Sequence, residues 1–378
     1  MRRKKILKHK TIQAPAHYHR NLSGLLFFPL MLSVFGLFFV YEASAILSLN
    51  NFSDSFHYLK LQSLWIFVGL LLMFFFSIFN YKKLKLLAFP AMIISIGLLI
   101  LVLIPGFGSV RGGASGWISL GFFNLQPTEV AKLASILYLA AWFEQKEARR
   151  FTSFLVLIGL LLFLIILQPD IGSAIVIFSL ATMIYFIAGK DLLKLLVFIP
   201  LGGVAFFMLI KAAPYRFNRL VAFMNPSADP LGVTYHINQI LISLANGGLF
   251  GKGFGASRQK YLYLPEPHTD SIFAIIGEEF GFIGAGVLVI AFAMLVYMLY
   301  RVYEMAPDNY GRLLAGGIFV FFSLQILVNL GGMVNIMPLT GVPLPFISYG
   351  GSHILISFIL MGIAINIARQ GVKAGVTK

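Results

Sequence analysis

Residues 271–300 read SIFAIIGEEFGFIGAGVLVIAFAMLVYMLY, and this stretch decides the class of fold. About 20 consecutive apolar residues cross the hydrocarbon core of a bilayer as a helix, and this run is longer. Its charged residues are two adjacent acids, Glu278 and Glu279. In a helix they lie about 12–14 Å beyond Asp270, a depth at which acids need partners or a water-filled cavity. The stretch therefore predicts a membrane-spanning helix with a polar interior neighbour.

The composition of the whole chain agrees with a membrane protein. The 378 residues are 59% hydrophobic and 11% charged, whereas soluble domains average about 45–50% and about 25%. This balance excludes an ordinary soluble enzyme and a disordered chain. Cysteine is absent, which excludes disulfides, thiolate metal sites and a cysteine nucleophile. The net charge of +15 is interpreted as an orientation signal, and no nucleic-acid partner is expected.

Ten apolar runs are expected to span the membrane. We therefore predict an all-α polytopic membrane protein, with a basic tail over 1–23, a membrane domain over 24–369 and a second tail over 370–378. The first run is too long for a signal-peptide core and is interpreted as a retained anchor. The expected spans are 24–48, 61–79, 86–104, 128–143, 152–168, 171–189, 192–210, 271–300, 311–334 and 346–368.

The distribution of charge predicts the orientation of these spans. Most of the 29 Lys and Arg residues fall on the side that carries both termini. Short loops rich in Lys and Arg face the cytoplasm, so both termini are expected inside. Residues 211–270 then form a long extracytoplasmic loop, and a loop of that length is usually functional.

Acidic residues at the expected outer face are candidates for a functional site. Glu129 lies one residue beyond the segment Gln126-Pro127-Thr128, at the start of the fourth span, with Lys132 three residues later. The pair either forms a simple ion pair in the first helical turn or marks a polar cavity. Asp170 follows Gln168 in a tight turn and either caps the sixth span or contributes to such a cavity.

The long outer loop adds cations and glycines. Arg216 and Arg219 are spaced for an interfacial helix that rests on lipid headgroups, or for binding a substrate phosphate. Five glycines over 247–255 form either a backbone nest for an anion or a re-entrant turn. Lys260 follows them.

Asp270 closes the long loop where the eighth span begins. It is expected either to cap that helix or to act as a general base at a membrane-edge cleft. The last outer loop, 335–353, is rich in proline and glycine, so its irregular backbone must be buried in protein or line a cavity. The outer histidines His236, His268 and His353 lack metal-ligand spacing, and no metal site is predicted.

Several of these segments, in this order, resemble the SEDS family (shape, elongation, division and sporulation). The resemblance runs from about residue 25 to 369. Its motifs include Gln126-Pro-Thr-Glu129 with Lys132, and Gln168-Pro-Asp170. Further motifs are Asp229-Pro-x-Gly with Gln239, Tyr263-Leu-Pro-Glu-x-His-Thr-Asp270, and Pro343-Leu-Pro-x-x-Ser348-Tyr-Gly-Gly-Ser352. The stretch 339–348 resembles the division or sporulation branch more than the elongation branch.

The resemblance implies a peptidoglycan glycosyltransferase of the bacterial cytoplasmic membrane. It would polymerise lipid II, the undecaprenyl-diphosphate-linked disaccharide pentapeptide, at the outer face. Its partners would be a class B penicillin-binding protein and other division or elongation proteins. The resemblance assigns the essential acid to Asp270. The substrate-binding candidates are Glu129, Lys132, Gln168, Asp170, Arg216, Gln239, Lys260, Ser348 and Ser352. The cofactor is not fixed by the sequence, and a divalent cation, Mg²⁺ or Mn²⁺, is a candidate for neutralising the diphosphate.

The chain departs from the family pattern at a few positions, including Gly116 before Trp117, His236 after Tyr235, Ser271 after Asp270, and His353. Two rival functions also remain open. A lipid flippase should carry polar groups across the whole bilayer, whereas the ionisable residues here gather near one face. A non-catalytic scaffold would not require an acid–lysine pair at membrane depth.

Overall fold

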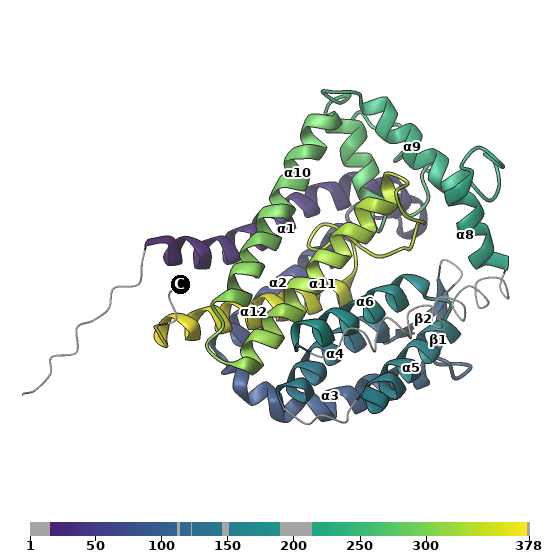
Figure 1. Ribbon diagram of the computed structural model, residues 1–378. Coiled ribbons are helices and arrows are strands. Elements are labelled where there is room, and N and C mark those ends of the chain that lie inside the picture. The colour runs from purple at the N-terminus through teal and green to yellow at the C-terminus, as the bar shows by residue number, and fades with distance from the viewer. Residues whose placement is uncertain (1–15, 112–113, 122, 146–150, 190–213, 376–378) are drawn as a thin grey trace, which may run out of the picture.

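The computed structural model describes residues 16–111, 114–121, 123–145, 151–189 and 214–375. The fold is a bundle of helices with one small sheet (Figure 1). The helices are α1 (Ala16–Phe52), α2 (His57–Ile78), α3 (Tyr81–Leu101), α4 (Pro127–Glu144), α5 (Phe151–Leu167), α6 (Ile171–Ile187), α8 (Pro214–Met224), α9 (Tyr235–Gly247), α10 (Ile272–Glu304), α11 (Asn309–Met333) and α12 (Gly351–Lys373).

Within the described residues, six helices are long and apolar enough to cross a membrane: α1, α2, α3, α10, α11 and α12. The helices α4, α5 and α6 coincide with three further expected spans. The expected seventh span, 192–210, lies outside the described residues. The chain is therefore a polytopic, mostly helical membrane protein.

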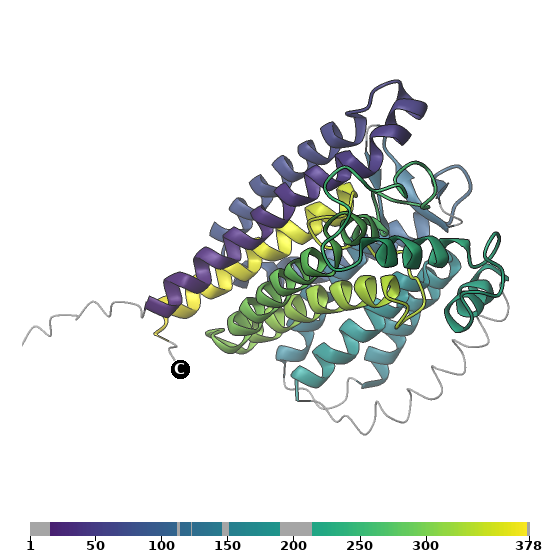
Figure 2. The same cartoon turned by 90° about the horizontal axis from the view of Figure 1, so that it is seen from above.

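The helices differ in how deeply they are buried. The most apolar window of α12 is 83% buried, whereas that of α3 is 28% buried. Figure 2 shows α12 running beside α1 and α2, and α12 makes its broadest contact with α2. The helix α12 thus forms the centre of the bundle, while the exposed phenylalanines and leucines of α2 and α3 face outward.

Polar residues at helix starts explain several boundaries. The side chain of Asn80 accepts a hydrogen bond from the amide of Lys82 at the start of α3. Asp170 accepts one from Ser173 at the start of α6, and Asp308 accepts one from Gly311 at the start of α11. Each side chain satisfies a backbone donor that has no partner within its helix.

A three-stranded antiparallel sheet corrects the expectation of an all-α fold. It comprises β1 (Gly108–Arg111), β2 (Ala114–Ser119) and β3 (Asn124–Leu125), in the order β1-β2-β3. Its strands are short and rich in glycine and serine, so their propensity for strand is weak. Pairing of β2 with both neighbours, which sequence pattern does not reveal, stabilises them.

The helix α10 is kinked at Gly281, which has a φ of 65° and a ψ of −168°. The freed backbone amides of Phe282 and Ile283 donate to Gly248 O and Leu249 O. The glycine-rich turn after α9 is thus bonded to the kink. Figure 2 shows α9 and the sheet at the end of the bundle opposite the first residues of α1 and the last residues of α12.

Candidate functional site

Asp270 lies immediately before α10 but does not cap it. The N-cap is Ser271, and its side chain makes no capping hydrogen bond. The half-buried Asp270 carboxylate instead accepts a hydrogen bond from Thr269 Oγ1 at 3.2 Å. A Cβ placed on Gly341 would lie 3.7 Å from Asp270 Oδ2. The carboxylate therefore faces the irregular segment between α11 and α12, and the capping alternative does not apply.

The helix α11 fixes the position of this acid through Asn329. The buried amide of Asn329 donates to Asp270 O at 2.9 Å and to Val342 O at 2.8 Å. One side chain therefore holds both the backbone that carries the carboxylate and the backbone that faces it.

A histidine and an arginine from the long loop complete this cluster. His236 Nε2 lies 2.7 Å from Ser271 Oγ, and Arg219 Nη1 donates to Leu339 O at 3.2 Å. Burial lowers the pKa of His236; the negative charge of Asp270 opposes that shift and the positive charge of Arg219 adds to it. The helices α8 and α9 thus bring a cation and an imidazole close to the segments that carry and face Asp270.

The predicted pair of Glu129 and Lys132 forms a second, fully buried cluster. Lys132 Nζ lies 2.5 Å from Glu129 Oε1, and each side chain is 1% exposed. His353 Nδ1, at the start of α12, lies 3.7 Å from Glu129 Oε2. Neither atom has a hydrogen-bond partner among the described residues. Enclosing two charges costs solvation free energy, which the contact between Glu129 and Lys132 offsets.

Asp170 joins the two clusters. Besides capping α6, it accepts a hydrogen bond from Thr128 Oγ1 at 3.3 Å, next to Glu129. A Cβ on Gly172 would lie 2.6 Å from Thr340 O, so only glycine allows this close approach. The backbone over 340–342 therefore lies between the start of α6 on one side and Asp270 on the other.

Several predicted substrate-binding residues serve the scaffold around this site. Gln168 Nε2 donates to Leu99 O at 3.1 Å. Ser348 Oγ accepts from Leu344 N at 2.8 Å, and Ser352 Oγ accepts from Gln126 N at 3.0 Å. Gln239 is half-buried on α9. Arg216 belongs to α8, and its side chain lies outside the described part of the structure.

Lys260 occupies a different, acidic environment. Its ammonium contacts Glu42 on α1 and lies 3.4 Å from Glu279 on α10. Burial lowers the pKa of Lys260, but these carboxylates outweigh that effect and hold it above its ordinary value. Glu278 in turn bonds Lys252 at 3.2 Å and Ser257 at 2.5 Å. The two acids of the opening sequence are thus explained as anchors of the glycine-rich turn.

Sequence reasoning missed two polar residues on α11. Phe321, Gln325 and Asn329 follow at intervals of four residues and share one helix face. Phe321 lies under Lys132, with 5.9 Å from Nζ to the ring centroid, and Asn329 holds Asp270. Gln325 lies between them, fully buried. Its amide has no partner among the described residues. The signal was two amides four residues apart in an apolar span.

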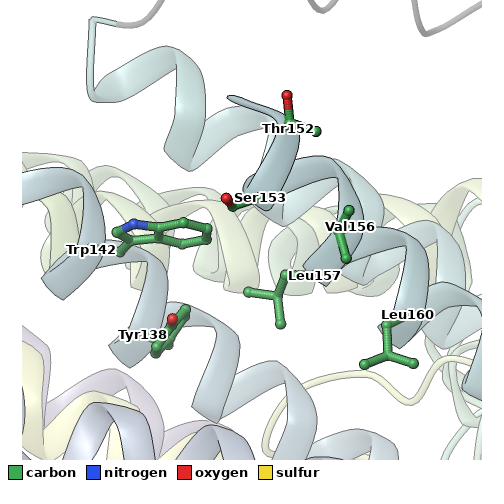
Figure 3. Close-up of a pocket in the computed structure, with 7 residues that line it drawn as sticks. All are labelled: Tyr138, Trp142, Thr152, Ser153, Val156, Leu157 and Leu160. Atoms are coloured by element: carbon green, nitrogen blue, oxygen red, sulfur yellow. The ribbon is translucent and has the colours of Figure 1, made fainter. Parts of the chain in front are cut away.

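A mainly apolar cavity lies away from this site. A cavity of about 390 Å³ lies between α4 and α5, lined by Tyr138, Trp142, Ser153 and Leu157 among others (Figure 3). Tyr138 is nine residues along α4 from Glu129, about 13 Å away. No charged side chain lines this cavity among the described residues. It therefore does not belong to the acidic site.

The described residues do not form a ready-made metal centre. They contain no group of three or more His, Asp or Glu side chains that could hold a metal ion. The site is instead made of carboxylates, one lysine, one arginine and two histidines on separate elements.

This geometry defines a class of protein: a helical membrane protein with acids, cations and amides gathered at one end of its bundle. The chain belongs to the FtsW/RodA/SpoVE family, described as "Cell cycle protein", whose model matches residues 23–373.

Known relatives cover almost the whole chain. It is 40% identical to stage V sporulation protein E of Bacillus subtilis over 91% of this chain and 96% of that protein. It is 39% identical to a probable peptidoglycan glycosyltransferase FtsW of Trichlorobacter lovleyi over 91% and 92% of the two chains. These sporulation and division relatives agree with the branch predicted from residues 339–348.

Solved structures share the fold. One chain of a peptidoglycan synthase complex that coordinates polymerization and crosslinking matches with a TM-score of 0.74 and 29% identity, over 92% of this chain and 98% of that chain. RodA of Thermus thermophilus matches with a TM-score of 0.67 and 28% identity, over 92% and 96%.

Proposed function

We propose that this chain is a peptidoglycan glycosyltransferase that polymerises lipid II at the outer face of the bacterial cytoplasmic membrane, with Asp270 as general base. The observation that carries the proposal is the position of Asp270. It does not cap α10, it faces the segment at Gly341, and Asn329 anchors its backbone. Relatives that carry the activity in their names support the same conclusion.

The reaction joins a sugar hydroxyl of one substrate to the anomeric carbon of another. The hydroxyl oxygen attacks that carbon, and the bond from the carbon to the diphosphate oxygen breaks. The diphosphate leaves with the electron pair, and the hydroxyl proton passes to the Asp270 carboxylate. A single direct displacement inverts the configuration at the anomeric carbon.

The leaving diphosphate requires positive charge. Arg219, which donates to Leu339 O next to the segment that faces Asp270, is one such cation. Lys132 lies over the ring of Phe321 on α11. Phe321 is about two helical turns from Asn329, with Gln325 between them. Both cations act through charge in a partly enclosed site, where such interactions exceed their strength in water. A bound Mg²⁺ or Mn²⁺ would neutralise the same diphosphate, and no step here is derived through it.

Asp170 and Glu129 belong to the binding region rather than to the chemical step. Both lie across the 340–342 backbone from Asp270, linked by Thr128 and Gly172. We assign the two acids to accepting hydrogen bonds from the sugar hydroxyls of the substrate, and Lys132 to its diphosphate. Lys260 and Ser348 act on the scaffold, because their polar atoms are used by protein partners.

The partner is a class B penicillin-binding protein, which cross-links the strands that this chain makes. A related chain belongs to a synthase complex that coordinates polymerization and crosslinking. Other membrane proteins of division or elongation are expected beside it. The cytoplasmic location of both termini rests on the excess of Lys and Arg in the short loops.

The test is to supply fluorescent lipid II and a divalent cation to the purified chain in liposomes, with a class B partner inactivated for cross-linking. We expect glycan polymer from the wild type and none from Asp270→Ala, with lipid II binding retained. If no polymer forms and the labelled lipid crosses the bilayer only with the protein present, the chain is a flippase. If the protein does not polymerise lipid II, translocate it across the bilayer or bind it, the protein is a scaffold.

A further inference from the structure

A second polar cavity lies at the end of the bundle away from Asp270. Its volume is about 590 Å³, and it is formed by the end of α2, the start of α3 and the end of α12. Pro307, just beyond the far end of α10, also lines it. Because Asp270 precedes the near end of that helix, the cavity is separate from the proposed active site.

Three cations line this cavity: Lys82, Arg369 and Lys373. None of the described lining residues is acidic. Asp308 contacts Lys82 at 3.0 Å from outside the lining. Elsewhere in the described part of the chain, no carboxylate forms an ion pair with Arg369 or Lys373. Arg369 and Lys373 are four residues apart and project from the same face of α12. The cavity therefore carries an excess of positive charge.

The floor of the cavity is a fixed network of amides. The buried Asn366 donates to Ser77 O at 2.8 Å and accepts from Tyr81 N at 3.1 Å. Gln370 Nε2 donates to Asn366 Oδ1 at 2.8 Å and to Asn80 Oδ1 at 3.1 Å. These bonds hold the ends of α2, α3 and α12 together. The cations are thus arranged around a pre-formed hollow rather than on a loose surface.

An exposed apolar strip leads away from the cavity along α2. Ile78 lines the cavity and is 58% exposed, and Phe74 and Phe75 before it are 66% and 53% exposed. These side chains lie in a helix apolar enough to cross a membrane. A ligand with an anionic head and an apolar tail would match both parts at once.

We infer that this cavity binds the phosphate group of an anionic phospholipid, with the acyl chains lying along Phe74, Phe75 and Ile78. Basic pockets between membrane helices are known to hold anionic headgroups. Arg369 supplies a planar guanidinium suited to paired contacts with phosphate oxygens, and Lys82 and Lys373 supply point charges. The site is independent of the glycosyltransferase proposal, because none of its residues touches the Asp270 cluster.

The experiment measures lipid binding by the full chain in a neutral detergent. Phosphatidylglycerol, phosphatidylcholine and inorganic phosphate are each titrated, and bound molecules are counted by native mass spectrometry. The test variant is Arg369→Gln with Lys373→Gln. The matched control is Lys83→Gln, which removes a neighbouring cation that does not line the cavity. Removing one cation should weaken binding about fivefold, so the double variant should weaken it about 25-fold.

The wild type is expected to retain phosphatidylglycerol in preference to phosphatidylcholine, with the Lys83→Gln protein unchanged. If inorganic phosphate binds the wild type as tightly as the lipid does, and the double variant loses this binding, the cavity is an anion site. Its ligand is then soluble phosphate, and the inference of a phospholipid is overturned. Equal lipid binding by the double variant and the wild type would overturn the inference. If the double variant does not fold, Lys373→Gln alone, at the exposed end of α12, replaces it, with a fivefold change expected.

Discussion

The side-chain amide of Asn329 donates a hydrogen bond to the backbone carbonyl of Asp270 over 2.9 Å. The same nitrogen donates to Val342 O over 2.8 Å. A residue in the middle of the bundle thus sets the distance between the proposed base and the segment it faces. Positioning of this kind matters in catalysis, because a displacement of about 1 Å can lower a rate about 100-fold.

Replacing Asn329 with Leu should therefore lower the rate of polymerisation about 10- to 100-fold and leave two buried carbonyls without their donor. The free energy of unfolding should fall by about 1–3 kcal/mol. Ser323→Ala on the same helix is the control, because among the described residues the Ser323 hydroxyl bonds only within its helix, to Phe319 O. Equal activity in the Asn329→Leu and wild-type proteins would show that this bond does not position Asp270.

The ion pair of Glu129 and Lys132 allows stability and function to be separated. Replacing Lys132 with Met leaves Glu129 buried without its cation, and should destabilise the protein by about 3–5 kcal/mol. Adding Glu129→Gln should recover most of that loss, because no buried charge remains. Thermal unfolding measures this recovery.

Activity should not recover with stability in the double variant, since the pair is proposed to bind substrate. A stable and fully active double variant would reduce the pair to a structural role.

His268 should make stability depend on pH. Its ring packs against the rings of Tyr58 and Tyr349, at centroid distances of 4.5 Å and 5.5 Å. Burial lowers its pKa from 6.5 to about 4. The unfolded chain therefore takes up a proton below 6.5, whereas the folded chain does so only near pH 4. This residue should thus lower the free energy of unfolding as pH falls through that window, by up to about 3 kcal/mol.

Chemical unfolding of wild type and His268→Phe at several pH values between neutral and 4 checks this expectation. The variant should show a shallower loss of stability. The same slope in both proteins would mean that other groups control the acid sensitivity.

Gly281 and Gly286 on α10 should respond in opposite ways to alanine. At Gly281 a Cβ would lie 2.3 Å from Gly251 N, in a backbone conformation suited to glycine. Gly281→Ala should cost about 3 kcal/mol or more. At Gly286 a Cβ would meet nothing within 4 Å, and alanine should be neutral or slightly stabilising. Similar unfolding temperatures for the two variants would contradict the role assigned to the kink.

Much of the fold was predictable because long apolar runs have few alternatives to a spanning helix. Every expected span within the described residues coincides with a helix, and α8 lies where Arg216 and Arg219 predicted an interfacial helix. The small sheet was not predictable, because its short strands, rich in glycine and serine, are stabilised by pairing between segments rather than by propensity.

The acids of the site were recognisable because charges are rare in such a chain. The contacts that join them were not. Capping was one of two roles expected for Asp170, and the structure confirms it. Capping was equally open for Asp270, where the start of α10 at Ser271 excludes it. The approach of Gly172 to Thr340, and the reach of Asn329 to Asp270, depend on packing between distant segments.

The most direct test of the account is a single-turnover assay of lipid II polymerisation with Asp270→Asn, run beside a measurement of lipid II binding. Asparagine keeps the shape of the side chain but cannot accept the proton as a carboxylate does. We expect Asp270→Asn to bind lipid II within about twofold of wild type and to polymerise it at a rate at least about 100-fold lower. A variant that binds lipid II and polymerises it at the wild-type rate would contradict the assignment of Asp270 as the base.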